Sequence, residues 1–483
     1  MSVDLGVNDL AFGVVAAGFS NEGMADLPAF GGYLVFARNG TSATEIRRAT
    51  DALRERYGSL APVVAIDQEG GSVARMRSGV EPMPSMMALG AAGDLELAER
   101  AGEQVAFDLR RAGCTMNLAP VLDLSLEAKN TVIGTRSIGS EPRAVGELGQ
   151  RFALGLERYA VTACFKHFPG HGSTAADSHD TLPVVEESAQ TLRARDLLPF
   201  GSVAPRARAM MGTHILFRSF DERPATSSMR LIGELLRGEF GFDGAFLTDC
   251  LEMGAVDDAA EAGIEALRAG ADLLLVSHSL DLARNVAETI GRAAENGALP
   301  LARLREAYAR VTRLRAVPPP LPLDAFPPHP GVGRELARRA ITLIRGLPHA
   351  DPTACCSVEF LPDVQAQRLV SQAPALEEVQ VGDEACAAEV DAAIERIVAS
   401  RRRPIVLARR AHLHPAQARA IARILDRFPD AMVVSVREPF DVALFPRARH
   451  VLAAYGDDTA SVGALADVLF GGIVPQGHLP VAL

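Results

Sequence analysis

The sequence is poor in cysteine, in long apolar runs and in positive charge, and each shortage argues against a class of protein. Its six cysteines show no repeated spacing and no Cys-x-x-Cys pair, which predicts buried thiols in a reducing compartment. No stretch reaches the roughly 18 uncharged apolar residues that a membrane-spanning helix needs. Because 60 Asp and Glu residues outnumber 49 Lys and Arg residues, the net charge of -11 disfavours nucleic acid and anionic membrane as partners.

The N-terminal stretch also lacks the pattern of a secretory signal. "MSVDLGVNDLAFGVVAAGFS" contains Asp4 and Asp9 and has no basic start followed by an apolar run. Together with the cysteine pattern, this predicts a cytoplasmic protein. A content of 48% hydrophobic and 23% charged residues is typical of soluble globular chains.

The length of 483 residues exceeds what one hydrophobic core usually fills, so we expect two domains. Residues 1–315 repeat one order: a short apolar run, a polar turn and a helix-like segment with apolar residues near i, i+3 and i+4. Continuous hydrophobicity is typical of strands that are buried on both faces. The apolar runs cover residues 11–19, 32–36, 62–66, 115–119, 161–165, 207–213, 244–248 and 271–276. Eight such units predict an α/β fold of the (β/α)8 TIM-type barrel, with an open doubly wound sheet as the alternative.

A proline-rich stretch follows the predicted barrel. "AVPPPLPLDAFPPHPG", residues 316–331, contains seven prolines and is typical of a stiff extended linker. After it, residues 332–483 alternate helical segments with strand candidates at 403–408, 431–436 and 450–456. This pattern predicts a second, smaller α/β domain.

Polar side chains follow the predicted barrel strands at the points where those strands end. Loops at the C-terminal ends of barrel strands converge over one opening, where the active site of such a barrel lies. The residues concerned are Asp67 after the third strand, Lys166 and His167 after the fifth, His214 after the sixth, Asp249 after the seventh, and Arg136 in the loop after the fourth.

The stretch "KHFPGHGSTAADSHD", residues 166–180, allows three interpretations. A metal site would use His167, His171 and His179, but Pro169 and Gly170 interrupt the helix on which an H-x3-H pair works best. A phosphate-binding loop would need a G-x-x-x-x-G-K-[ST] motif, which "GHGSTAAD" does not supply. Both of these interpretations are therefore weak.

The third interpretation is proton transfer by Asp177 and His179. In a bent loop the carboxylate can hold the imidazole tautomer and stabilise its cation, and histidine can give and retake a proton near neutral pH. The alternative is an Asx-turn at Asp177 with an exposed histidine. Residue types alone leave this alternative open.

The segment "FLTDCLEMGAV" also has two interpretations. Asp249 and Glu252 match the spacing of a capping box that opens a helix, with Glu252 as a solvated helix residue. Asp249 also ends the seventh strand, where an ionised carboxylate can act as a nucleophile.

The other residues at this opening have structural alternatives as well. These alternatives are a turn cap for Asp67, a surface helix residue for Arg75, and an ion pair with Glu141 for Arg136. A lysine at the end of a buried strand, such as Lys166, needs a partner. We expect His214 to be a buried, hydrogen-bonded group that does not act on substrate, and Asp123 to brace the loop after the fourth strand.

Together these motifs resemble glycoside hydrolase family three, in its β-N-acetylhexosaminidase branch. The resemblance rests on six segments of the predicted barrel, of which the fifth is the most specific: "LVFARN", "AIDQEGGSVARM", "NLAPVLDL", "GTRSIG", "KHFPGHGSTAADSHDTLP" and "GFDGAFLTDCLEMGAV". Residues 332–483 resemble the C-terminal α/β sandwich of the two-domain members in "RAITLIRG", "VVSVREPFDVAL" and "VLFGGIVPQGHLPV".

The resemblance implies a role for each matching residue. Asp249 corresponds to the catalytic nucleophile, and His179 with its partner Asp177 corresponds to the general acid/base of this branch. The positions that hold the hydroxyls and the N-acetyl group of the innermost sugar correspond to Asp67, Arg75, Arg136, Lys166 and His167. Ser72 departs from the arginine that is common there, and Thr213 departs from the common alanine.

The resemblance implies a retaining exo-β-N-acetylglucosaminidase that forms a glycosyl-enzyme on Asp249. Its substrates would be peptidoglycan fragments or chito-oligosaccharides with a terminal β-GlcNAc, and phosphate could replace water in the second step because a neutral imidazole base does not repel an anion. The alternatives are a family β-glucosidase or β-xylosidase, whose acid/base is a glutamate of the second domain, and a non-catalytic sugar-binding protein. A substrate-assisted hexosaminidase would need adjacent carboxylates after one strand to orient the acetamido group, and we find none there. We predict no metal, no cofactor and no particular oligomeric state.

Overall fold

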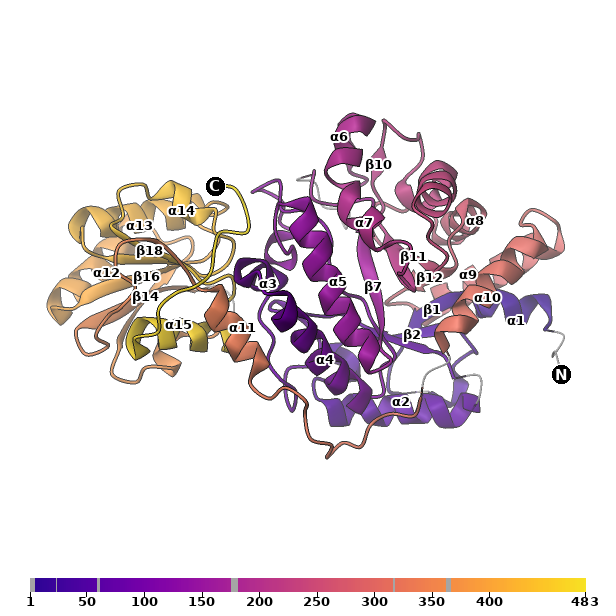
Figure 1. Cartoon of the computed structure of the whole chain (residues 1–483), viewed down its shortest axis with the longest axis horizontal. Coiled ribbons are helices and arrows are strands. Elements are labelled where there is room, and N and C mark those ends of the chain that lie inside the picture. Colours follow the sequence, from indigo (N-terminus) through magenta and orange to yellow (C-terminus); the bar gives the residue numbers. More distant parts are fainter. Residues whose placement is uncertain (1–4, 23, 59–60, 175–180, 316–317, 362–365) are drawn as a thin grey trace.

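Eight parallel strands close into a barrel, and a second sheet lies beside it (Figure 1). The computed structural model describes the chain except for residues 1–4, 23, 59–60, 175–180, 316–317 and 362–365. The barrel strands are β1 (Val15–Gly18), β2 (Gly32–Val35), β3 (Val63–Ile66), β6 (Met116–Asn117), β7 (Thr162–Phe168), β9 (Ala209–Gly212), β11 (Ala245–Cys250) and β12 (Leu273–Val276). Each pairs with its neighbour along the chain, and β12 pairs with β1, which closes the barrel and excludes the open sheet.

The barrel strands look continuously apolar in the sequence because both of their faces are buried. In β1, Ala16 belongs to the cluster inside the barrel, whereas Val15 and Ala17 pack outward under the surrounding helices. In β3, Ala65 likewise faces inward while Val64 and Ile66 face outward. Side chains alternate along a strand, so an apolar interior and an apolar exterior together remove the usual polar–apolar alternation.

Helices surround the barrel and pack their apolar faces on its outer surface. They are α1 (Val7–Phe12), α2 (Ala43–Tyr57), α3 (Met86–Ala92), α4 (Leu95–Arg111), α5 (Pro142–Arg158), α6 (Ala189–Ala194), α7 (Leu197–Val203), the π-helix η6 (Arg230–Glu239), α8 (Ala259–Ala269), α9 (Leu280–Glu295) and α10 (Leu301–Arg315). Local signals set their ends: in α2, Ser42 accepts the N–H of Glu45, and Glu45 accepts the N–H of Ser42.

Shorter elements lie in the loops around the barrel opening. They are the hairpin β4 (Gln68–Gly70) and β5 (Val73–Ala74), the pair β8 (Val184–Val185) and β10 (Leu216–Phe217), and the 3-10 turns η1 (Met24–Asp26), η2 (Ala37–Asn39), η4 (Gly134–Arg136) and η5 (Ala225–Ser227). The hairpin follows β3, and η4 lies between β6 and α5. Both therefore extend from the C-terminal end of a barrel strand.

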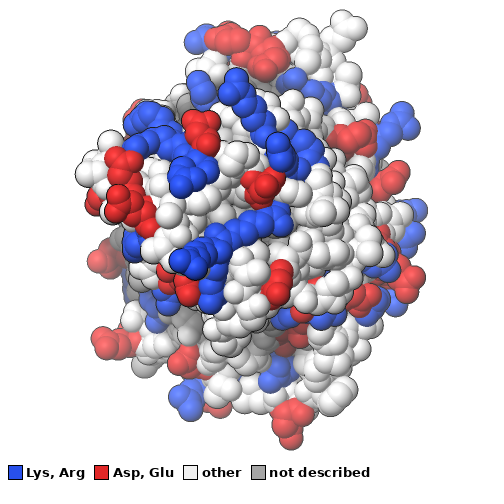
Figure 2. Space-filling model, turned by 90° about the vertical axis from the view of Figure 1, so that its left-hand side faces the viewer, with Lys and Arg blue, Asp and Glu red and all other residues white. Residues whose placement is uncertain are grey.

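The second sheet has six strands in the order β13-β18-β17-β16-β14-β15, with β13 antiparallel to β18 and the other pairs parallel. Its elements are β13 (Thr342–Arg345), β14 (Cys355–Leu361), η7 (Leu369–Ser371), β15 (Glu377–Gly382), β16 (Arg403–Ala408), β17 (Met432–Ser435), β18 (His450–Ala453), and the helices α11 (Val332–Ala340), α12 (Ala387–Ser400), α13 (Pro415–Arg427), α14 (Asp441–Leu444) and α15 (Thr459–Gly471). One face packs against α11 and α15, and the other against α12 and α13. On the end of the molecule formed by this sheet, basic and acidic side chains are interspersed (Figure 2).

The chain between the barrel and the second sheet is held against the barrel by arginines of α2 and α4. Arg110 donates to the carbonyls of Pro318 and Pro319, and Arg111 donates to that of Leu323. Prolines supply no N–H of their own, so their carbonyls accept from these arginines, while the N–H groups of Leu321 and His329 donate to Arg110 and Gln104 of α4. The segment runs along the barrel before it enters α11 (Figure 1).

The second sheet contacts the barrel directly. Met87, Ala88 and Ala91 of α3 share an apolar cluster with Tyr455 and Val481. At the same contact, the carbonyl of Pro480 accepts the N–H of Ser140, and that of Ala91 accepts the N–H of His478. Segments far apart in the sequence therefore complete one interface.

The prediction of a parallel eight-stranded barrel with a separate second sheet is confirmed, and each predicted run overlaps one barrel strand, although β7 and β11 extend past the ends of their runs. The first run, 11–19, also includes the end of α1, because the helix and strand there are both apolar. The strand predictions at 403–408, 431–436 and 450–456 correspond to β16, β17 and β18, whereas β14 and β15 were not predicted. Among the residues that the structure describes, every helix is too short or too polar to span a bilayer.

Candidate active site

A cavity of about 430 Å³ lies at the C-terminal ends of the barrel strands. Six of the eight predicted site residues line it: Asp67, Arg75, Arg136, Lys166, His167 and Asp249. Asp177 and His179 lie outside the described residues. The fold therefore brings together side chains that follow or end four barrel strands, β3, β6, β7 and β11, as loops over one barrel opening should.

Side chains of alternating charge form a row of ion pairs along one wall of the cavity. The Nζ of Lys166 lies 2.8 Å from Oδ1 of Asp67 and 2.7 Å from Oε1 of Glu69. Arg136 donates to both oxygens of Glu69, from Nε at 2.9 Å and from Nη2 at 2.8 Å. At the other end, Arg75 pairs with Asp67 at 3.2 Å. Each buried charge thus has a partner of opposite sign, which offsets the cost of its burial.

The network holds these groups in their charged forms. Burial alone would raise the pKa of Asp67 and of Glu69, yet the cations beside them hold both pKa values below their usual range. Burial alone would lower the pKa of Lys166, yet Asp67 and Glu69 raise it. Near neutral pH the cavity wall therefore carries fixed charged acceptors and donors, which suit hydrogen bonds to hydroxyl and amide groups.

A fully buried carboxylate orients the imidazole of His167. Nδ1 of His167 lies 2.5 Å from Oδ2 of Asp123, and the same carboxylate accepts the backbone N–H groups of His167 and His171. With Nδ1 donating to Asp123, Nε2 lies 3.5 Å from Nη2 of Arg136. Asp123 braces a loop as expected, but the loop is the one that follows β7.

Asp249 lies half-buried at the end of β11, where its Oδ1 accepts the backbone N–H of Cys250 at 2.8 Å. The capping-box interpretation is wrong, because the next helix, α8, begins at Ala259 and is capped by Asp258. Glu252 is not a solvated helix residue. Its carboxylate accepts the N–H groups of Ser277, His278 and Ser279 at 2.6–2.8 Å and so joins the loops that follow β11 and β12.

Several structural alternatives from the sequence are also wrong. Arg136 pairs with Glu69 and not with Glu141, which caps the N-terminus of α5. Arg75 lies beside the hairpin β4–β5 and not on a helix. Glu69, next to the predicted Asp67 in "DQEGG", was missed, although the need of Lys166 and Arg136 for partners was a usable signal.

His214 is buried next to the site and does not line the cavity. Its Nδ1 lies 2.8 Å from the hydroxyl of Thr226. Burial lowers the pKa of His214 below its ordinary value, so the folded state favours the neutral ring. The expectation of a buried, hydrogen-bonded histidine is confirmed.

Replacing His214 with glutamine is expected to weaken the pH dependence of stability. A histidine with a lowered pKa in the folded state is neutral there, while the unfolded chain takes up a proton below its ordinary pKa of about 6.5. Stability is therefore lost as the pH falls from that value towards the folded pKa. In thermal unfolding at pH 7 and pH 5.5, the Tm of the wild type should fall more than that of His214→Gln. His414→Gln, at a more exposed histidine, is the control, and equal falls for wild type and His214→Gln would contradict the argument.

Known proteins are similar to this chain over the barrel. The model of the glycosyl hydrolase family 3 N-terminal domain matches residues 15–314, which extend from β1 into the last turn of α10. The beta-hexosaminidase of Pseudomonas aeruginosa is 37% identical over 253 residues, covering 52% of this chain and 75% of the relative. The beta-hexosaminidase of Alkalilimnicola ehrlichii is 39% identical over 263 residues, covering 52% and 74%.

Solved structures include one that is similar along the whole length of both chains. The glycoside hydrolase family 3 beta-N-acetylglucosaminidase from a Paenibacillus species is 32% identical, covers 99% of both chains and has a TM-score of 0.91. The family match spans the barrel that forms the charged cavity, and the structural match includes the second sheet. The chain therefore belongs to glycosyl hydrolase family 3 and is a glycoside hydrolase.

Proposed function

We propose that the protein is a retaining exo-β-N-acetylglucosaminidase that removes a non-reducing terminal β-GlcNAc from peptidoglycan fragments or chito-oligosaccharides. The observation that supports this most is the cavity itself, in which Asp249 faces the same space as the paired charges around Lys166. The names of the beta-hexosaminidase relatives and of the Paenibacillus enzyme point to the same substrate class.

In the proposed mechanism Asp249 attacks the anomeric carbon and forms a glycosyl-enzyme. His179, held by Asp177, protonates the departing oxygen and then removes a proton from water as the intermediate breaks down. The described part of the preceding loop supports this assignment, because His171 lines the cavity only eight positions before His179. Proton donor and nucleophile would then lie across one sugar-sized space.

The other cavity residues hold the sugar in this proposal. Asp67 and Lys166 offer a carboxylate acceptor and an ammonium donor at 2.8 Å from each other, so one hydroxyl can bind both. His167 and Arg136 lie next to each other with Nε2 and Nη2 3.5 Å apart, and we assign them, with Arg75, to the remaining hydroxyls and the N-acetyl group. Binding by pre-paired charges needs little reorganisation when the substrate enters.

We also propose that a histidine as the acid/base allows phosphate to take part in the breakdown of the glycosyl-enzyme. A neutral imidazole does not repel an approaching anion as a carboxylate would, so phosphate can replace water and release GlcNAc-1-phosphate. Three cations and three carboxylates line the cavity, and Asp249 loses its charge when the glycosyl-enzyme forms, so the cations are then in excess and favour the approach of an anion.

Kinetics and product analysis test both statements. We expect hydrolysis of 4-nitrophenyl β-GlcNAc and little or no hydrolysis of the β-glucoside, with GlcNAc-1-phosphate formed when phosphate is abundant. The reverse substrate preference would support the β-glucosidase alternative and contradict the proposed function. GlcNAc as the sole product with and without phosphate would contradict phosphorolysis alone.

We further propose three parts for the chain: a catalytic barrel (1–315), a proline-rich linker (316–331) and a C-terminal α/β sandwich domain (332–483). Separate apolar clusters on the two faces of the second sheet support its description as a sandwich. We place the enzyme in the cytoplasm, where it would act on cell-wall fragments during recycling. Its six unpaired cysteines support a reducing compartment.

A further inference from the structure

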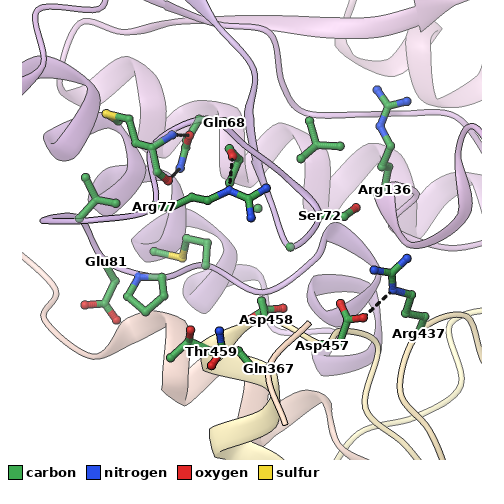
Figure 3. A pocket seen from close by; sticks show the side chains of 18 of the residues that line it. Gln68, Ser72, Arg77, Glu81, Arg136, Gln367, Arg437, Asp457, Asp458 and Thr459 are labelled. Carbon is green, nitrogen blue, oxygen red and sulfur yellow. Dashed lines mark hydrogen bonds and ion pairs between the residues drawn. The ribbon is translucent and has the colours of Figure 1, made fainter. Parts of the chain in front are cut away.

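The loop between β6 and α5 lies between the active-site cavity and the second sheet. Its 3-10 turn η4 ends with Arg136, whose guanidinium binds Glu69 inside the barrel opening. A second cavity of about 520 Å³ separates part of this loop from the second sheet (Figure 3). In that view the side chain of Arg136 points away from the Arg437–Asp457 pair of the second sheet.

The backbone of this loop meets an ion pair of the second sheet at Gly134. A Cβ on Gly134 would lie 2.1 Å from Oε1 of Glu438 and 3.1 Å from Nη2 of Arg410. Gly134 also has a φ of +45°, a region that side chains disfavour. The close approach and the conformation both require glycine, so the backbone of η4 rests directly on the pair.

The ion pair itself is a rigid support. Arg410 donates to Glu438 from Nη2 at 2.7 Å and from Nε at 3.1 Å, and the Glu438 side chain is only 3% exposed. Burial alone would raise the pKa of Glu438, yet Arg410 holds it below its usual range. A bidentate, buried, charged pair has little freedom to move.

The same loop is also tied to the segment that follows β7. Oδ1 of Asn130 accepts the N–H groups of Val132 and Ile133, while its Nδ2 donates to the carbonyls of His171 and Thr174. A displacement at Gly134 would therefore act on both sides of the cavity.

We propose that Arg410 and Glu438 are positioning residues of the active site, which set the place of Arg136 through the backbone of Gly134. Neither residue touches the sugar. The inference rests on the proposed function, in which Arg136 binds the substrate, and it gives the second sheet a part in substrate binding.

Replacing Glu438 with alanine tests this directly. We expect the KM for 4-nitrophenyl β-GlcNAc to rise about tenfold with a much smaller change in kcat, because Arg136 contacts the bound sugar before and during the reaction. In an Arg136→Ala background the same substitution should add less than about twofold, since residues that act through one another are not additive.

Glu359→Ala is the matched control. Glu359 is the buried partner of Arg409, the neighbour of Arg410 in the sequence, at 2.7 Å, and its hydrogen bonds within the described part of the chain go to Arg409 and Leu369 and not to η4. It should lower the Tm while leaving KM unchanged. Amide hydrogen exchange in residues 130–136 should increase in Glu438→Ala and remain at the wild-type level in Glu359→Ala.

A second variant changes the barrel side of the same contact. Gly134→Ala places a methyl group against Glu438 and should raise KM in the same way, which keeps the test valid if Glu438→Ala folds poorly. A wild type without turnover would contradict the proposed function on which the inference rests. Turnover by the wild type, with unchanged KM in both Glu438→Ala and Gly134→Ala, would contradict the inference alone.

Discussion

The Asp249→Ala variant is expected to lose at least about 10⁴-fold in kcat on 4-nitrophenyl β-GlcNAc while its Tm stays near that of the wild type. The loss follows from the missing nucleophile, without which no glycosyl-enzyme can form. The Tm should change little because Asp249 is half-buried and its one described hydrogen bond is to the adjacent backbone N–H of Cys250. Steady-state kinetics and a thermal melt measure the two effects.

Asp243→Ala is the control for this substitution. Asp243 precedes the same strand, β11, at its opposite end, and its side chain is 77% exposed and paired with Arg313. It should keep full activity. His179→Ala should lose less than Asp249→Ala with this good leaving group and more with a poor one, because the proton donor assists departure. An unchanged rate in both Asp249→Ala and His179→Ala would refute the assignment of the catalytic pair.

The Glu69→Ala variant is expected to lose about 3–5 kcal/mol of stability together with most of its activity. Glu69 is 1% exposed and is the shared partner of Lys166 and Arg136, so its removal leaves two buried cations with too little compensating charge. Those cations would repel each other and move, and the sugar would lose its binding groups. Denaturant unfolding measures the loss of stability, and steady-state kinetics at saturating substrate, without denaturant, measures the loss of activity.

Glu186→Ala is the control for Glu69. It removes an exposed ion pair with Arg218, in which the two side chains are 70% and 49% exposed, and should cost less than about 1 kcal/mol. Glu69→Ala with wild-type stability would show that the paired charges of the cavity wall do not depend on the carboxylate of Glu69.

The sequence was sufficient for the barrel because its strands are short and buried on both faces. Runs such as "GYLVF" and "PVVAI" contain little except apolar residues, and turns and helices separate them clearly. In the second sheet, β15 has exposed polar residues between its buried ones, so no continuous run marked it. Its pairing with β14 depends on a strand alignment that local pattern does not encode.

Site residues at strand ends were also within reach of the sequence, because topology brings strand ends together. The residues that pair with them could not be predicted from the sequence. Arg136 has an acid five positions later in Glu141, yet it binds Glu69, which is 67 positions away. Glu252 has the spacing of a capping residue, yet its partners lie 25 to 27 positions further on. Local spacing offers a plausible partner in each case, and only tertiary structure decides between it and the distant one.

The contact between Ser140 and Pro480 also has a consequence for the order in which the protein folds during translation. These residues lie 340 positions apart, and Ser140 belongs to the loop between β6 and α5. A ribosome has therefore translated the whole barrel long before it adds the residue on which that loop rests. The loop between β6 and α5 therefore gains this contact only after the tail that follows α15, which contains Pro480, has been made.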